Sequence, residues 1–399
     1  MKILAFPHHL EIGGSQTNAI DIATALRDDH GHDVVFFATP GPGEKLIADR
    51  GLRLLAAPRP RSSPSPSVIR ALSRVIRSEG VDVVHAWDWP QCLDAFLGAR
   101  VAHDVPVVGS IMSMVVTRAV PTSIPLTYGT PALLEQARAI HRGPLALLEP
   151  PINTAIDDPT IVDGLAFRAD RGVTSDQLVV VVVSRLVDWL KLDGISRSID
   201  AVDTLADTWP VRFFIVGEGR AFMELARRAT VVNERHGRHV ITLTDAMIDP
   251  RPAYAAADVV LGMGGSVLRG MAFGKPAIVL GEQGFAETFE LGTAERFLHE
   301  GFFGTGAAAV PLRQQLGLLL DSAERRSELG AWSQALVRER FSLQHAAAQL
   351  DAFIRASAVG RPPRTRAALE GAIAVSRRLA GATLPAVVKD RIRGRGKSR

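Results

Sequence analysis

Two cationic side chains, Arg185 and Lys191, are the first candidates for chemistry, because they follow the apolar run 178–183, which is typical of a central buried strand. In doubly wound sheets, ligands bind beyond the carboxyl ends of such strands. A guanidinium offers a planar fork of donors and an ammonium offers a point charge, so the pair suits a diphosphate. This position disfavours the alternative, which is ordinary solvated surface charge.

A second candidate is the segment 262–266, which lies between a predicted strand and a predicted helix and has three glycines in four residues. Backbone N–H groups at the start of a helix attract anions, and glycines let a ligand approach the backbone closely. An ordinary turn rarely needs so many glycines. We therefore predict a cradle for an anion or a sugar, formed by Gly264, Gly265, Ser266 and, one turn further on, Arg269.

The first strand-to-helix turn holds Gly13 and Gly14 and could also receive a ligand. The turn lacks the G-x-G-x-x-G pattern, and no acidic residue ends the following strand, so it is not a dinucleotide-binding fingerprint. A tight turn without any ligand explains these glycines equally well. Both interpretations stay open at this point.

A fourth group, His85 and Asp88 with the neighbouring Trp87 and Trp89, follows the predicted strand 81–84. These side chains could hold a polyol by hydrogen bonding and stacking. The alternative is a structural histidine beside two tryptophans that pack in the core.

The remaining candidates are weaker. Glu287 lies in the loop after the predicted strand 276–280, where a lone carboxylate is usually solvated. Histidines 8, 9, 30 and 32 lack the spacing and the partners of a metal site, so we predict no metal. Cys92 is the only cysteine, which excludes an internal disulfide framework and fits a reducing compartment.

The elements that must position these residues alternate between strand and helix. Strands rich in Val, Ile and Leu alternate with helices, which predicts parallel sheets covered on both faces. Two such series occur, separated by a segment rich in Pro and Asp, 149–159. The first series has predicted strands at 2–6, 33–38, 81–86, 105–109 and 145–148, and the second at 178–183, 211–216, 240–243, 258–261 and 276–280.

This alternation predicts the domain organisation of the 399-residue chain, which is long enough for two domains. We expect an N-terminal Rossmann-like domain over 1–150, a linker over 151–170 and a C-terminal Rossmann-like domain over 171–340. A closing helix over 341–358 would pack back on the first domain. Residues 359–399 would form a basic tail.

The charge is unevenly distributed along the chain. Residues 361–399 carry a net charge of +9 and residues 1–360 a net charge of −5. An acidic body argues against binding to nucleic acid and points to a separate role for the tail. The tail is either a flexible solubilising segment or a means of attachment to an anionic membrane surface. No apolar run reaches the ~18 residues that a membrane span needs, so we expect a cytoplasmic protein, with peripheral attachment to the inner face of the membrane if the tail binds lipid.

Six motifs, taken in order, resemble those of the large retaining glycosyltransferase family that includes sucrose and trehalose synthases and mannosyltransferases. Each motif is weak alone, but the order and the intervening elements make the resemblance specific over about residues 1–350. The motifs are Gly13-Gly14, segment 81–86, Ser184-Arg185-Leu186 with Lys191, and segments 214–219, 254–260 and 271–276.

The resemblance implies a GT-B fold, in which two Rossmann-like domains with doubly wound parallel sheets face each other across a cleft. The C-terminal domain would bind a nucleoside-diphosphate sugar, with UDP or GDP as the favoured nucleotide, and the N-terminal domain would bind a hydroxyl acceptor through the residues around Gly13, Gly14, His85 and Asp88. Arg185 and Lys191 would hold the diphosphate. Glu218, Gly219 and Asp245 would lie near the nucleotide. The reaction would proceed with retention and without a cofactor or a metal, and the acceptor would be a saccharide, a lipid-linked saccharide or a small molecule.

The sequence departs from the family pattern at one important position. The family places two glutamates, seven residues apart, before the stretch that matches 271–276, and the loop is shorter here. Arg269 stands where the second glutamate belongs, and a guanidinium cannot accept bonds from ribose hydroxyls. Two alternatives to a transferase therefore stay open: a GT-B nucleotide-sugar epimerase or hydrolase, and a catalytically silent subunit of a glycosylation complex.

Overall fold

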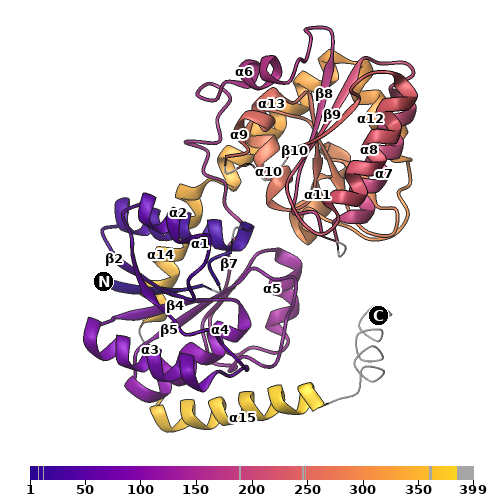
Figure 1. The fold of residues 1–399 in the computed structure, drawn as a ribbon. Coiled ribbons are helices and arrows are strands. Elements are labelled where there is room, and N and C mark those ends of the chain that lie inside the picture. Colours follow the sequence, from indigo (N-terminus) through magenta and orange to yellow (C-terminus); the bar gives the residue numbers. More distant parts are fainter. Residues whose placement is uncertain are drawn as a thin grey trace. The chain divides into compact units, whose positions relative to one another are not determined.

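The computed structural model describes residues 1–7, 9–11, 13–187, 190–244, 247, 249–358 and 362–383. The chain divides into two compact units, one of residues Met1–Glu149 with Ala346–Arg399 and the other of residues Pro150–His345 (Figure 1). Each unit is a parallel sheet with helices packed against it. No helix in the described ranges combines the length and the apolar character that crossing a membrane requires.

The sheet of the first unit has the strand order β3-β2-β1-β4-β5-β6-β7, and all of its pairings are parallel. Its strands are β1 (Lys2–Phe6), β2 (Asp33–Ala38), β3 (Arg53–Ala56), β4 (Val83–Trp87), β5 (Val107–Ile111), β6 (Leu126–Tyr128) and β7 (Leu145–Leu147). Its helices are α1 (Gly14–Asp28), α2 (Glu44–Asp49), α3 (Pro66–Glu79), α4 (Asp88–Ala95), the π-helix η1 (Phe96–Val101), α5 (Pro131–Arg138) and α15 (Arg364–Thr383), and α14 (Leu343–Ser357) lies mostly in it.

The second unit has the strand order β10-β9-β8-β11-β12-β13, and only β13 is antiparallel to its neighbour. Its strands are β8 (Leu178–Val183), β9 (Val211–Val216), β10 (Ile241–Thr244), β11 (Val259–Gly262), β12 (Ala277–Leu280) and β13 (Ala286–Thr288). Its helices are α6 (Gly164–Asp170), α7 (Leu192–Leu205), α8 (Phe222–His236), α9 (Arg251–Ala256), α10 (Gly265–Ala272), α11 (Leu291–Glu300), α12 (Leu312–Asp321) and α13 (Ala323–Arg340).

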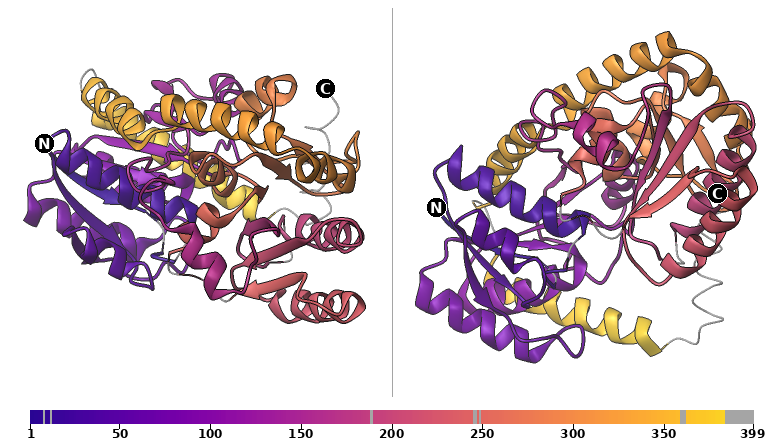
Figure 2. Two further views of the ribbon diagram at one scale, coloured as in Figure 1. Left: turned by 90° about the horizontal axis from the view of Figure 1, so that it is seen from above. Right: turned by 45° about the horizontal axis from the view of Figure 1, so that its top comes forward.

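Strand β8 shows why an almost pure valine run is needed at the centre of a sheet. Val180 and Val182 face the core beneath α7, α8 and α12, and Val179 and Val181 face the opposite core, which contains Tyr254 of α9. Because both faces are covered, successive side chains are all apolar and all less than 2% exposed. Figure 2 shows these helical layers in two further views.

Two predicted segments differ from expectation. Residues 151–170 are not a bare linker, because they contain α6, whose N-cap Asp163 accepts a bond from Ala166 and whose Phe167 is buried in the second unit. The basic tail is not a flexible segment over its first half, because residues 364–383 form helix α15. Residues 384–399, which include the basic end at 391–399, lie outside the described residues.

Candidate functional site

The strand orders define where a ligand would bind in each unit. In the second unit, strand β8 lies between β9, which is the next strand along the chain, and β11. In the first unit, β1 lies in the same way between β2 and β4. At such switch points the loops beyond the strands diverge and leave space at the carboxyl edge of the sheet. The candidate residues after β8 and β11, and those after β1 and β4, lie at these two edges.

The cation pair follows β8 directly. Arg185 is exposed in the loop, and Lys191 is the half-buried residue at the start of α7. Burial and the nearby positive charge of Arg185 lower the pKa of Lys191 to about 8. Within the described ranges, neither side chain has a carboxylate partner. Two neighbouring cations that have no counter-ion among the described residues favour an anion.

The loop that carries Arg185 is locked to the loop after β9. The backbone N–H of Leu186 donates to the Glu218 carbonyl at 2.8 Å, and that of Ala221 donates to the Leu186 carbonyl at 3.0 Å. Gly217 and Gly219 have φ angles of 146° and 149°, and a Cβ on either would lie 1.9 Å from the Ser184 carbonyl oxygen or 2.2 Å from that of Leu186. These glycines are therefore required for the close approach of the two loops.

Glu282 supports the same site, a role that the sequence analysis did not assign. It follows β12, and its Oε1 accepts a bond from the backbone N–H of Leu190 at 3.2 Å. Leu190 has a φ of 66°, which a leucine rarely adopts, and immediately precedes Lys191. The Glu282 carboxylate thus fixes the backbone at Leu190 and thereby positions Lys191. The only signal in the sequence was its position after an apolar strand.

The glycine-rich segment after β11 forms an open helix start. Gly264 has a φ of 60°, and a Cβ built on Gly264 or Gly265 would meet no atom within 4 Å. Internal packing therefore does not demand glycine at Gly265. The Ser266 hydroxyl donates to the Met263 carbonyl at 3.0 Å and keeps its capacity to accept a bond. The N–H groups of this turn suit an anion.

Two other predicted site residues, Arg269 and Glu287, are placed differently from expectation. Arg269 donates from Nε to Oδ2 of Asp157 at 2.9 Å, and the Asp157 side chain is only 2% exposed, so this arginine compensates a buried carboxylate. Glu287 lies in strand β13 rather than in a loop, and it forms an ion pair with Arg296. Glu218 is exposed beyond β9. Asp245 lies outside the described residues.

In the first unit, Gly13 is the N-cap of α1 and Gly14 its first residue. A Cβ on Gly14 would meet no atom within 4 Å, whereas one on Gly13 would lie 2.9 Å from the Gln16 side chain. The turn therefore has free space beside Gly14. This is compatible with a turn that receives a ligand and with a tight turn that binds none.

His85 and Asp88 have structural contacts. His85 is 2% exposed, its Nε2 lies 2.8 Å from the Ser110 hydroxyl, and burial lowers its pKa to about 3. The structure favours the alternative of a structural histidine over a contact with an acceptor. Asp88 accepts the backbone N–H groups of Met112 and Ser113 on Oδ1 at 3.1 and 2.9 Å, and so shapes the loop after β5.

Three buried polar atoms beside Asp88 have no hydrogen-bond partner in the described part of the chain. They are Nε1 of Trp87, Oε1 of Gln91 and the hydroxyl of Ser113. Trp87 precedes Asp88, Gln91 lies one turn further in α4, and Ser113 is bonded to Asp88 through its backbone. Buried polar atoms normally find partners, so an N–H donor, a carbonyl acceptor and a hydroxyl that can do both suit an uncharged polar ligand when the described residues leave them unpaired.

The described residues contain no group of three or more His, Cys, Asp or Glu side chains that could hold a metal ion.

Comparisons with known proteins agree with this arrangement. Residues 12–140 match the family model Glycosyltransferase Family 4, and residues 177–304 match Glycosyl transferases group 1. No curated protein matches the chain significantly.

Solved structures resemble the whole fold at low identity. A glycosyltransferase from Rickettsia africae is 16% identical with a TM-score of 0.71, and the match covers 88% of this chain and 97% of that one. HepE from Anabaena, solved in complex with UDP, is 16% identical with a TM-score of 0.70 and coverages of 89% and 100%. WaaG, a glycosyltransferase involved in lipopolysaccharide biosynthesis, is 16% identical with a TM-score of 0.60 and coverages of 88% and 99%.

Proposed function

Because the chain belongs to the group 1 glycosyltransferases and has their GT-B fold, we propose that it transfers a sugar from a nucleoside-diphosphate sugar to an acceptor hydroxyl with retention of configuration. The observation that carries this proposal is the pair Arg185 and Lys191, which lies beyond the central strand without a carboxylate partner among the described residues.

The chemistry follows from the charges. As the bond between the sugar and the diphosphate breaks, negative charge develops on the leaving oxygen. Arg185, Lys191 and the N–H groups of Gly265 and Ser266 would stabilise that charge from positions that the fold fixes in advance. These groups supply the positive potential that a divalent cation supplies in metal-dependent transferases, so we propose that the reaction does not need a metal. The acceptor hydroxyl would attack the anomeric carbon from the face that the diphosphate leaves, and its proton would pass to the departing phosphate oxygen as the bond between the sugar and the diphosphate breaks.

We propose a UDP-sugar as the donor, because HepE, a structural neighbour, has been solved with UDP and with UDP-glucose. We propose an acceptor with sugar hydroxyls, because Trp87, Gln91 and Ser113 offer hydrogen bonds and no charge. The net charge of +9 over residues 361–399 supports a peripheral position on an anionic membrane, where the acceptor would be a lipid-linked saccharide.

The experiment that tests the function is thermal unfolding of the full chain with UDP-, GDP-, ADP- and TDP-sugars, each compared with the free sugar as the control. Binding to the folded state raises the unfolding midpoint. We expect stabilisation by one nucleotide class and none by the free sugar, followed by release of the nucleoside diphosphate when an acceptor mixture is added. No stabilisation by any nucleotide would instead favour a catalytically silent subunit.

Donor affinity should also depend on pH through Lys191. Its pKa of about 8 means that the ammonium loses its proton as the pH rises through and above this value, and a bound diphosphate would move the midpoint higher. We expect the affinity for UDP-glucose, measured by calorimetry, to be constant near neutral pH and to fall in alkaline solution. The control is Lys191→Arg, whose guanidinium stays charged. If both proteins lose affinity over the same range, Lys191 does not carry the dependence.

A further inference from the structure

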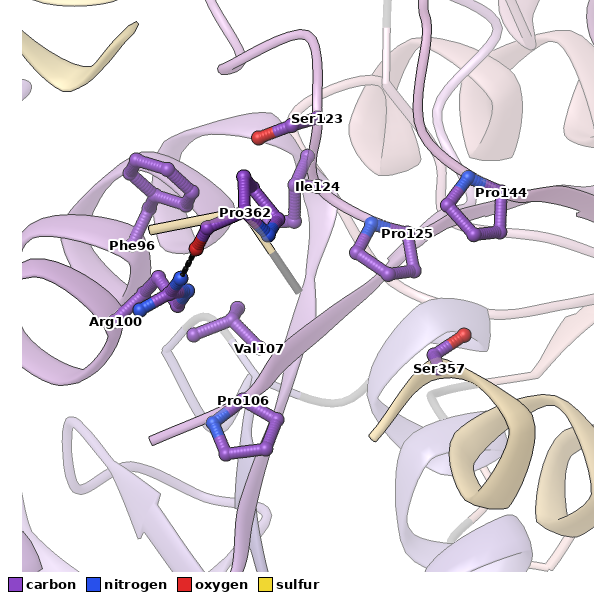
Figure 3. Close-up of a pocket in the computed structure, with 10 residues that line it drawn as sticks. All are labelled: Phe96, Arg100, Pro106, Val107, Ser123, Ile124, Pro125, Pro144, Ser357 and Pro362. Atoms are coloured by element: carbon purple, nitrogen blue, oxygen red, sulfur yellow. Dashed lines mark hydrogen bonds between the residues drawn. The ribbon is translucent and has the colours of Figure 1, made fainter. Parts of the chain in front are cut away.

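Helix α15 is docked on the first unit by named contacts at both ends. At its start, Arg100 donates to the Pro362 carbonyl beside a pocket that prolines 106, 125 and 144 line (Figure 3), and Arg364 donates to the carbonyls of Val101 and Ala102 at 2.9 Å. Near its end, the guanidinium of Arg378 lies 5.2 Å from the centre of the Trp89 ring. The helix therefore runs from the amino edge of the sheet to the carboxyl edge.

The inner face of α15 is made of small residues that allow a close approach to η1. Ala367 and Ala374 are 0% and 2% exposed, and a Cβ on Gly371 would lie 3.0 Å from the Leu97 side chain. Glu370 adds a polar contact, because it accepts the backbone N–H of Ser123 at 3.2 Å. The docked face thus needs no large apolar side chain.

The outer face carries the large apolar side chains instead. Leu369, Ile373 and Leu379 are 63%, 39% and 55% exposed, and Ala372, Ser376 and Ala380 lie between them at helical spacing. Arg377 is exposed at the flank of this row. A helix that exposes an apolar row beside basic residues is typical of a segment lying in a membrane interface.

We propose that the outer face of α15, defined by Leu369, Ile373 and Leu379, inserts into the headgroup region of an anionic bilayer, with the helix in the plane of the membrane. This role of α15 rests on the proposed function, in which the protein occupies a peripheral position on an anionic membrane. The charge favours an anionic bilayer as the partner of this face. Residues 361–399 carry a net charge of +9, which attracts anionic lipid and repels the same face of a second copy of the protein.

The end of α15 packs near the residues proposed for the acceptor. The guanidinium of Arg378 lies over the ring of Trp89, which is one residue after Asp88 and two before Gln91. This contact is made by the docked face of α15, so the outer face stays available to a bilayer.

The first test measures binding of the full chain to phosphatidylcholine vesicles with and without phosphatidylglycerol. We expect the triple variant Leu369→Gln, Ile373→Gln, Leu379→Gln to lose about tenfold or more of its partitioning to anionic vesicles. The matched control changes three exposed apolar residues of the second unit, Leu165, Met223 and Val231, to glutamine and should bind as the wild type does. Equal binding of wild type and the triple variant would overturn the proposal, since attachment would then depend on the charges alone.

A fluorescent probe supplies a second, local test. Cys92 is the only cysteine and is buried, so a surface cysteine can be labelled selectively. A polarity-sensitive label on Ile373→Cys should shift to the blue with anionic vesicles, and one on Val231→Cys should not. No shift at position 373, or a shift that appears on self-association without lipid, would overturn the proposal.

Binding of UDP-glucose measured without vesicles separates the two proposals. Loss of membrane insertion with intact donor binding refutes only the role of α15. Insertion without any donor binding refutes the transferase function and leaves α15 as a membrane helix.

Discussion

Arg185→Ala and Lys191→Ala should each weaken the binding of a nucleoside-diphosphate sugar by about tenfold to a hundredfold, because each removes a charge-assisted hydrogen bond to a phosphate. The side chains lie together beyond β8, and burial with the charge of Arg185 already lowers the pKa of Lys191 to about 8. The measurement is calorimetric titration with UDP-glucose or with the donor that the thermal unfolding panel selects.

The matched control for this pair is Arg227→Ala, which removes an exposed arginine of α8 in the same unit. This variant should bind the donor as the wild type does, so that a general loss of positive charge is distinguished from loss of the site. Unchanged donor affinity in both single variants at the site would refute the assignment of the diphosphate to Arg185 and Lys191.

Gly217→Ala and Gly219→Ala should each destabilise the second unit by roughly 2–5 kcal/mol, since a methyl group forces apart two backbones and the φ angle disfavours any side chain. The new Cβ atoms would lie 1.9 Å and 2.2 Å from the carbonyl oxygens of Ser184 and Leu186. The measurement is the free energy of unfolding in urea. Donor affinity should fall as well, because these carbonyls belong to the loop that holds Arg185.

Gly292→Ala is the control for backbone substitution. Gly292 lies in the first turn of α11, and a Cβ there would meet no atom within 4 Å. Alanine at this position should leave stability unchanged or raise it slightly, because it restricts the unfolded chain. If Gly217→Ala unfolds at the same urea concentration as Gly292→Ala, the contact between the loops after β8 and β9 does not constrain the fold.

The long, evenly apolar strands were the predictable part of the fold. Residues 2–6, 33–38, 178–183 and 211–216 were predicted with the observed bounds, because a strand covered on both faces is apolar at nearly every position. The exceptions are Lys2 and Asp33, which begin their strands, and Arg212. Three strands were missed: β3, which is only partly buried at the edge of its sheet, and β6 and β13, which have three residues each. Short or half-exposed strands have too few apolar residues to show a period.

The sequence by itself determined which residues follow the central strands. In a parallel sheet, position after an apolar run places a side chain at the ligand-binding edge, so Arg185, Lys191 and the glycines after β11 could be named from the order of the chain alone. The resemblance to the glycosyltransferases rests on the same local patterns, and the family models match the same two regions.

Only the tertiary structure decided what those residues contact. Arg269 binds the buried Asp157, and His85 is buried against Ser110. Glu282 fixes the backbone before Lys191. Helix α15 is oriented so that its small residues face η1 and its leucines face outward. These outcomes depend on partners between 25 and 112 residues away, or on which face of a helix finds a surface to pack against. Local spacing limits where a side chain can point, but its burial, its pKa and its partner are set by atoms that the fold brings from elsewhere in the chain.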